Sequence, residues 1–88
     1  MKIKEGFILR KIAGSHVVVA VGKAAENFKG MITLNDTGAF MWNILCTGVD
    51  TQNDIVDALM SNYDVNKDTA TKDVYSFVEK IKNAGFLE

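Results

Sequence analysis

The 88-residue sequence predicts a small α+β domain, in which a three-stranded antiparallel sheet is followed by three helices in the order βββααα. Two observations support this class. The first part of the chain holds runs of β-branched and aromatic residues separated by glycine-containing turns, a pattern typical of strands. The second part repeats apolar residues every three or four positions, a pattern typical of helices that bury one face. The change comes at Asn35 and Asp36, whose side chains can cap a helix.

The predicted strands begin with Phe7–Ile12 and His16–Val21, which form a hairpin across a turn at Gly14. The second of these holds four valines in six residues and should be the centre of the sheet. A polar connection with one helical turn leads to a third strand over Phe28–Leu34, with a bend near Gly30. In this order the third strand pairs on one side only, so its other edge is open.

The predicted helices cover most of the remaining chain. The first runs over about 36–46 and ends near Gly48, and the second runs from a Thr51 cap over 51–63. The third runs over about 66–84 and has the clearest apolar stripe, with Gly85 placed to end it. We find no repeat or linker, so residues 1–88 are expected to form a single domain.

Composition excludes several classes of function. A net charge of −1 and a pI near 5.7 disfavour binding to nucleic acid through phosphate neutralisation, and disfavour anionic membranes for the same reason. The chain has no apolar run near the roughly 20 residues that span a membrane, and its N-terminus lacks the pattern of a secretory signal. The sequence therefore predicts a cytoplasmic protein with no nucleic-acid or membrane partner.

No catalytic group is convincing in this sequence. Cys46 is the only cysteine and His16 the only histidine, and they fall in separate predicted elements, so neither a nucleophile–base pair nor a cysteine zinc site can be built. We interpret Cys46 as a half-buried small hydrophobe. The glycines occur singly and form no phosphate-binding loop. We therefore expect no catalysis, no metal and no cofactor.

DNA binding is the alternative function. The last two predicted helices, joined through Tyr63–Val65, resemble a helix-turn-helix, with the strands as a wing placed in front. The final helix has no arginine to read guanine. Its charges nearly balance, with four lysines against three acids: Lys67, Lys72, Lys80 and Lys82 against Asp68, Asp73 and Glu79. Charge therefore leaves a winged helix-turn-helix DNA binder as the weaker hypothesis.

Peptide binding fits the pattern better. An open strand edge beside a helix with a broad apolar stripe makes a groove, in which an extended peptide can add a strand through backbone hydrogen bonds. The centre of the stripe, at Val74, Phe77 and Ile81, is interpreted as core. The same open edge also allows pairing with a second copy, so a homodimer is a further expectation.

Residues 31–42, which read MITLNDTGAFMW, resemble the L-N-x-T-G/A-A-x-x-W segment of the PqqD-like family, named for a protein of pyrroloquinoline quinone biosynthesis. The resemblance continues through 51–59, Tyr63–Val65 and the closing Gly85–Leu87. It implies a winged helix-turn-helix-like domain that recognises precursor peptides made by ribosomes and modified afterwards. In this family the leader segment of the precursor adds to the third strand and packs along the third helix. The domain does no chemistry and delivers the leader to a modifying enzyme, often a radical S-adenosylmethionine enzyme.

Carried onto this sequence, the resemblance places the peptide-binding edge at Met31, Ile32 and Thr33. The candidate contacts on the final helix are Val74, Tyr75, Val78 and Lys82. Helical geometry places these residues on one flank of the stripe and leaves open the opposite flank, through Asp73, Phe77 and Lys80.

Overall fold

The computed structural model describes residues 1–27 and 31–88, and its elements confirm the predicted α+β class. The strands are β1 (Phe7–Ile12), β2 (Ser15–Ala20) and β3 (Ile32–Leu34), and the helices are α1 (Ala24–Asn27), α2 (Asp36–Thr47), α3 (Gln52–Asn62) and α4 (Lys67–Asn83). The long helices agree with the three predicted ones to within two residues at each end. The single turn α1 lies in the polar connection where one turn was expected.

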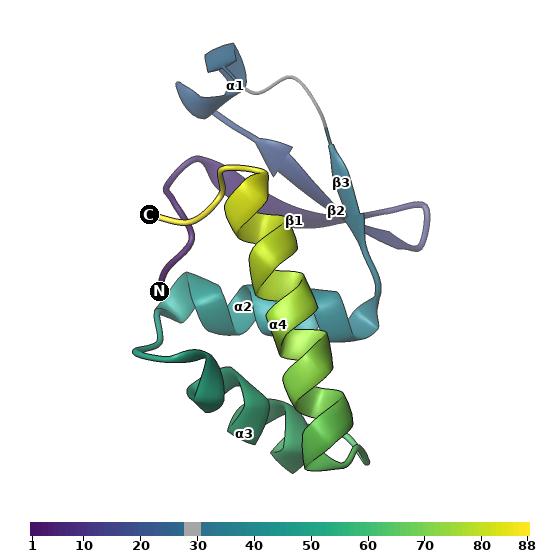
Figure 1. Cartoon of the computed structure of the whole chain (residues 1–88). Helices are drawn as coiled ribbons and strands as arrows, with labels where there is room; N and C mark the ends of the chain where they lie inside the picture. Colours follow the sequence, from purple (N-terminus) through teal and green to yellow (C-terminus); the bar gives the residue numbers. More distant parts are fainter. Residues whose placement is uncertain (28–30) are drawn as a thin grey trace.

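The three strands form one antiparallel sheet in the order β1–β2–β3. Ala13 and Gly14 make the hairpin turn, and both have positive φ, at 51° and 83°, as a type I′ turn requires. Figure 1 shows α2 below the sheet and α3 below α2, whereas α4 runs from beside α3, past α2, up to the sheet. Strand β3 pairs only with β2 among the described residues, so its other edge is free.

Strand β3 is shorter than predicted. It begins at Ile32, so Met31 precedes the strand rather than belonging to it. The predicted start at Phe28 and the predicted bend at Gly30 lie outside the described residues. The shortening has a physical reason, because the α1 turn after β2 carries the chain away from the sheet, and pairing resumes only where Ile32 stands opposite Val18.

The helix starts are fixed by side-chain caps, and two of these caps, at Asn35 and Thr51, are at predicted positions. The Oδ1 atom of Asn35 accepts from the Gly38 N–H at 2.7 Å and begins α2. Thr51 and Asp54 form a reciprocal capping box at the start of α3. Asn66 caps α4 in the same way as Asn35 caps α2. Each cap satisfies a backbone N–H that the helix itself leaves unpaired.

The core lies between the helices and one face of the sheet, centred on Trp42 and Phe86, which are 1% and 0% exposed. Their rings meet edge to face, with centroids 5.7 Å apart. Gly85, at φ +85°, ends α4 so that the Phe86 N–H donates to the Ile81 carbonyl at 3.1 Å. This glycine-capped end, which the sequence predicted at Gly85, turns Phe86 back into the core.

Cys46 is exposed, whereas the sequence predicted a half-buried side chain. Leu45 takes the core position on α2, and the next residue is rotated about 100° around the helix, away from the core. Desolvation by the surrounding protein still raises the pKa of the Cys46 thiol. A raised pKa lowers the thiolate fraction, which is the opposite of an activated nucleophile.

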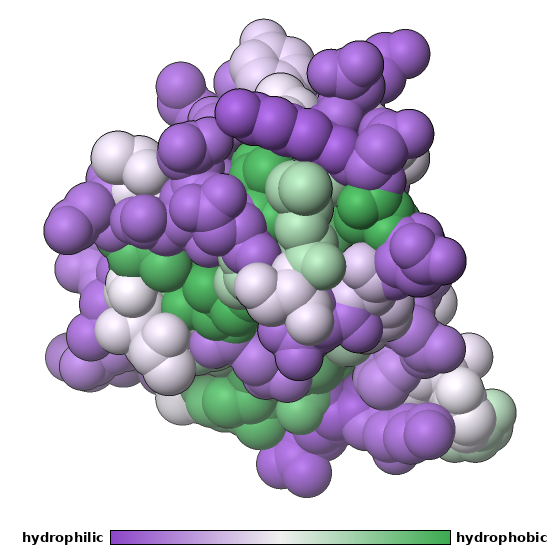
Figure 2. Space-filling model, turned by 90° about the horizontal axis from the view of Figure 1, so that it is seen from below, coloured by the Kyte–Doolittle hydropathy of each residue, from purple (hydrophilic) through white to green (hydrophobic). Residues whose placement is uncertain are grey.

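The surface seen from below is mostly hydrophilic, and hydrophobic side chains show through it in separate patches (Figure 2). Among the described residues, no helix combines the length and apolar character needed to cross a membrane. Nor does that part of the chain gather three or more His, Cys, Asp or Glu side chains in a metal-binding arrangement.

Candidate functional site

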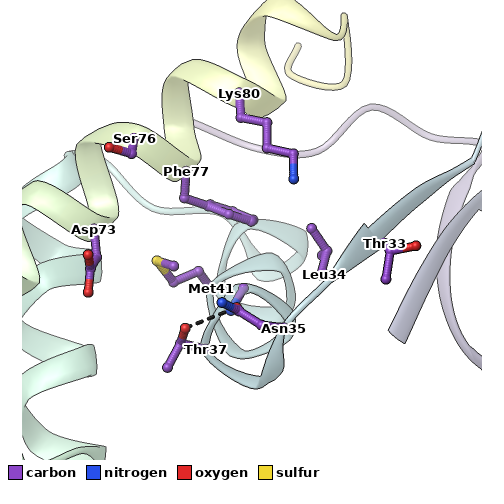
Figure 3. A pocket seen from close by; sticks show the side chains of 10 residues that line it. Thr33, Leu34, Asn35, Thr37, Met41, Asp73, Ser76, Phe77 and Lys80 are labelled. Carbon is purple, nitrogen blue, oxygen red and sulfur yellow. Dashed lines mark hydrogen bonds between the residues drawn. The ribbon is translucent and has the colours of Figure 1, made fainter. Parts of the chain in front are cut away.

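A hollow of ≈ 450 Å³ lies between the end of β3, the first turns of α2 and one flank of α4. We refer to it as the β3 groove, and Figure 3 shows its lining side chains. The lining residues come from all three elements: Thr33, Leu34, Asn35, Thr37, Gly38, Met41, Asp73, Ser76, Phe77 and Lys80. Residues far apart in the sequence therefore build one site at the free edge of the sheet.

The groove has an apolar floor and a charged rim. Leu34, Met41 and Phe77 form the floor and are all at least 93% buried. Asp73 and Lys80 stand on α4 on opposite sides of Phe77 (Figure 3). Both are exposed, and within the described residues neither side chain takes part in a hydrogen bond or an ion pair. The rim thus offers one unpaired negative charge and one unpaired positive charge.

Asn35 fixes the junction between β3 and α2. Besides capping Gly38, its Oδ1 atom accepts from the Thr37 hydroxyl at 3.1 Å. A Cβ atom at Gly38 would lie 3.0 Å from Asn35 Oδ1 and 3.3 Å from Leu34 Cβ, so glycine permits this close approach. At the residue after Asn35, the Oδ1 atom of Asp36 lies 2.9 Å from His16 Nε2, and this contact links β2 to the first turn of α2. The end of β3 is therefore held at a defined place beside the groove.

The hairpin determines which backbone groups of β3 face outward. Its two-residue turn closes on the Ile12–Ser15 pair, which is a hydrogen-bonded pair in such turns. Bonded and non-bonded pairs alternate along an antiparallel ladder, so Val17 pairs with β1 and its two neighbours pair with β3. Those neighbours stand opposite Ile32 and Leu34. Thr33 therefore directs both its N–H and its C=O away from β2, toward the free edge.

The three predicted edge residues have different roles in the structure. Thr33 lines the β3 groove and carries the outward backbone groups. The backbone N–H and C=O of Ile32 pair with β2, and its side chain packs against the core. Met31 is 69% exposed and lies before the strand. The edge that can accept a further strand is thus centred on Thr33.

The predicted helix residues do not gather at the β3 groove. Val74 is fully buried in the core, and Tyr75 is 58% exposed. Val78 and Lys82 line a different hollow, which we call the terminal hollow because Met1 and Leu87 also line it. The structure therefore does not bring these four side chains together with Thr33. The flank that meets β3 is the one the sequence left open, at Asp73, Phe77 and Lys80.

Six lining residues were absent from the sequence-based site, and two of these, Leu34 and Asn35, were predicted only as the end of the third strand and as a helix cap. Ser76 had a usable signal, because it lies between Asp73 and Lys80 at helical spacing and so continues the same flank. The others come from the start of α2, namely Thr37, Gly38 and Met41. Their approach to α4 depends on the packing of two helices, which no local pattern predicts.

These features make the β3 groove an open site beside a free strand edge, a geometry suited to receiving an extended segment of another chain. The chain belongs to the PqqD family, whose model, described as coenzyme PQQ synthesis protein D, matches residues 15–87. This match confirms the resemblance drawn from the sequence.

Two solved structures share the fold. The first is described as TbiB1 in complex with the TbiA(beta) leader peptide. It has a TM-score of 0.75 and 25% identity, over 100% of this chain and 95% of that one. The second is a lasso peptide synthetase B1 complexed with the leader peptide, with a TM-score of 0.71 and 21% identity, over 97% of this chain and 93% of that one. The comparison with curated proteins gave no match.

Proposed function

We propose that the chain binds the leader segment of a ribosomally made precursor peptide and presents it to a modifying enzyme. The observation that carries this proposal is the position of Thr33, whose outward N–H and C=O lie beside a groove with an apolar floor. Family membership supports it. So does the likeness to TbiB1, whose structure contains a leader peptide.

The leader adds to β3 as a further antiparallel strand. Its backbone bonds to Thr33, and the side chains on one of its faces enter the β3 groove. Backbone pairing supplies affinity that does not depend on the leader's sequence, whereas the floor at Leu34, Met41 and Phe77 selects apolar side chains. The strand edge therefore supplies affinity, and the floor of the groove supplies selectivity.

The domain acts without catalysis of its own. Holding the leader near the modifying enzyme makes presentation of the core peptide nearly intramolecular, with an effective concentration in the millimolar range for a short flexible connection. The partner that the family resemblance implies is a modifying enzyme, often a radical S-adenosylmethionine enzyme, and we place both proteins in the cytoplasm. The β3 groove needs no cofactor for this role, because strand addition uses only backbone and side-chain contacts.

An NMR titration tests the site directly. The ¹⁵N-labelled chain is titrated with the leader peptides encoded beside its gene. We expect amide shifts to cluster on β3, on the first turns of α2 and on Asp73–Lys80 of α4. Shifts gathered around Val78 and Lys82 instead would move the site to the terminal hollow and contradict the groove assignment.

A single proline isolates the backbone contribution. Thr33→Pro deletes a donor that β2 does not use, so leader affinity should fall about 10- to 100-fold while the domain stays folded. Thr33→Val keeps the N–H and a β-branched side chain, and should retain binding. Unchanged affinity in a folded Thr33→Pro chain would exclude strand addition.

Two further measurements test the other hypotheses. Light scattering on the free chain tests whether it forms a homodimer. DNA binding that weakens steeply with salt would favour the alternative function.

A further inference from the structure

We infer that the leader read by this chain carries a basic, an apolar and an acidic residue at alternating positions, in that order from its N-terminus. The inference rests on the proposed function and deepens it. It assigns the basic residue to Asp73, the apolar residue to the floor around Phe77, and the acidic residue to Lys80. The recognised pattern is therefore basic-x-apolar-x-acidic.

The spacing of the α4 side chains matches one face of an extended strand. Asp73 and Lys80 are seven residues apart, which is about 10.5 Å along a helix, with Phe77 between them. Alternate residues of a strand are about 6.7 Å apart, so three residues on one face span about 13 Å. The reach of the lysine and aspartate side chains covers the difference. One face of a single added strand can therefore meet all three groups.

The register selects which leader residues enter the groove. The leader residue opposite Thr33 exchanges both backbone hydrogen bonds with it, and its side chain lies on the same face of the sheet as that of Thr33. Side chains alternate along a strand, and Leu34 points to the core face. The leader residue opposite Leu34 therefore lies over the apolar floor. The residues two positions before and after it also face α4.

The direction of the strand sets the order of the charges. Figure 1 shows β3 descending toward α2, whereas α4 rises from its start at Lys67 toward the sheet. Every pairing between the described strands is antiparallel, and antiparallel pairing is slightly more stable per residue. A leader antiparallel to β3 thus runs in the direction of α4. Its N-terminal part passes Asp73 and its C-terminal part passes Lys80.

The side-chain charges of Asp73 and Lys80 are free to pair with charges on the leader. Both are exposed and unpaired within the described residues, so a leader charge displaces no existing ion pair. Each exposed pair contributes little alone, but exchanging the two leader charges turns two attractions into two repulsions. We expect this exchange to change affinity about 10-fold at low salt, and less at 1 M salt because the charges are screened.

The test uses two dye-labelled 12-residue peptides of identical composition, one with Lys-x-Leu-x-Glu at its centre and the other with Glu-x-Leu-x-Lys. Fluorescence anisotropy with the full chain should show the first binding about 10-fold tighter. The double variant Asp73→Lys/Lys80→Glu should prefer the second peptide. Lys82→Glu makes the same charge change as Lys80→Glu, but two residues further along α4 and about 200° around the helix, at the terminal hollow, so it should leave the preference unchanged.

The outcomes separate this inference from the proposed function. Equal affinity for the two peptides, with amide shifts on β3, would overturn the charge order and leave leader binding intact. Tighter binding of the second peptide would overturn the strand direction. If the encoded leader binds and neither designed peptide does, the pattern is insufficient and the inference falls. If the encoded leader also leaves β3 unshifted, the proposed function falls with it.

Discussion

The two flanks of α4 are margins of the same apolar stripe, yet they face different surroundings. One flank, at Phe77, looks onto the free edge of β3. The other, at Val78, looks onto the two ends of the chain, where Ile3 bridges to Leu87 and the Glu88 N–H donates to the Lys2 carbonyl at 3.0 Å. The first flank meets unpaired backbone, whereas the second meets backbone that is already hydrogen-bonded.

This difference shows what makes a hollow suitable for an extended peptide. Both hollows are open and of similar size, at ≈ 450 and ≈ 410 Å³. Strand addition needs a free N–H and C=O beside the groove, and Thr33 supplies them only to the first. Size does not separate the two sites, and the more apolar lining belongs to the terminal hollow. The state of the neighbouring backbone separates them.

The largest effect should come from truncating the two flanks separately. Phe77→Ala removes a ring that is both core and groove floor, so it should cost about 3 kcal/mol of stability and weaken leader binding at least 10-fold. Val78→Ala should cost about 2 kcal/mol and leave the leader Kd within twofold. Urea unfolding gives the stabilities, and calorimetric titration gives the affinities.

Comparing the Phe77 and Val78 variants distinguishes a loss of leader binding from a general loss of structure. If Phe77→Ala is too unstable to titrate, Phe77→Leu keeps an apolar core residue but loses the ring that contacts the Gly38 side of the groove. We still expect it to bind several-fold more weakly than Val78→Ala, despite a smaller stability loss. Equal binding losses in both variants would mean that the flanks are not distinct.

The sequence predicted the order of elements well because each signal was local. The glycine-capped end at Gly85, the capping box at Thr51 and the apolar stripe of α4 all depend on residues within a turn or two. The open edge of β3 also followed from sheet order alone. These features could be found without knowing how the helices pack.

The site was predicted only in part, because its remaining parts depend on packing. A helical stripe has two margins, and periodicity gives no reason to prefer Phe77 over Val78 as the one beside β3. The burial of Ile3 was also missed, since it comes from pairing with Leu87 at the other end of the chain. The outward direction of the Thr33 backbone follows from the hairpin register, which becomes visible only when the turn is located.

A smaller effect should separate two asparagine caps. Asn35 and Asn66 each accept a backbone N–H at the start of a helix, at 2.7 and 2.8 Å, but only Asn35 lines the β3 groove. Alanine at either position should cost about 1 kcal/mol of stability. Only Asn35→Ala should also weaken leader binding, by a few-fold, because the junction that holds the end of β3 is loosened. Thermal unfolding and calorimetric titration measure the two quantities.

Restoring the cap tests the cause. Asn35→Asp keeps an oxygen acceptor for the Gly38 N–H and should recover most of the stability and the binding. If Asn66→Ala weakened the leader as much as Asn35→Ala, the effect would belong to helix stability in general, and the end of β3 would have no particular role.

The smallest effect concerns Cys46, which lines neither hollow. Desolvation raises the pKa of its thiol, so at pH 7 to 8 the folded chain holds less thiolate than the unfolded chain. Alkylation by iodoacetamide should therefore be a few-fold slower in the folded chain, and the gap should close as pH rises above the raised pKa. Because the unfolded chain loses this proton at lower pH than the folded chain does, stability should fall slightly as pH rises from the ordinary pKa of the thiol to its raised pKa. Bound leader should not change the rate, since the β3 groove lies elsewhere. Protection of Cys46 by the leader would place a second contact on α2, outside both flanks of α4.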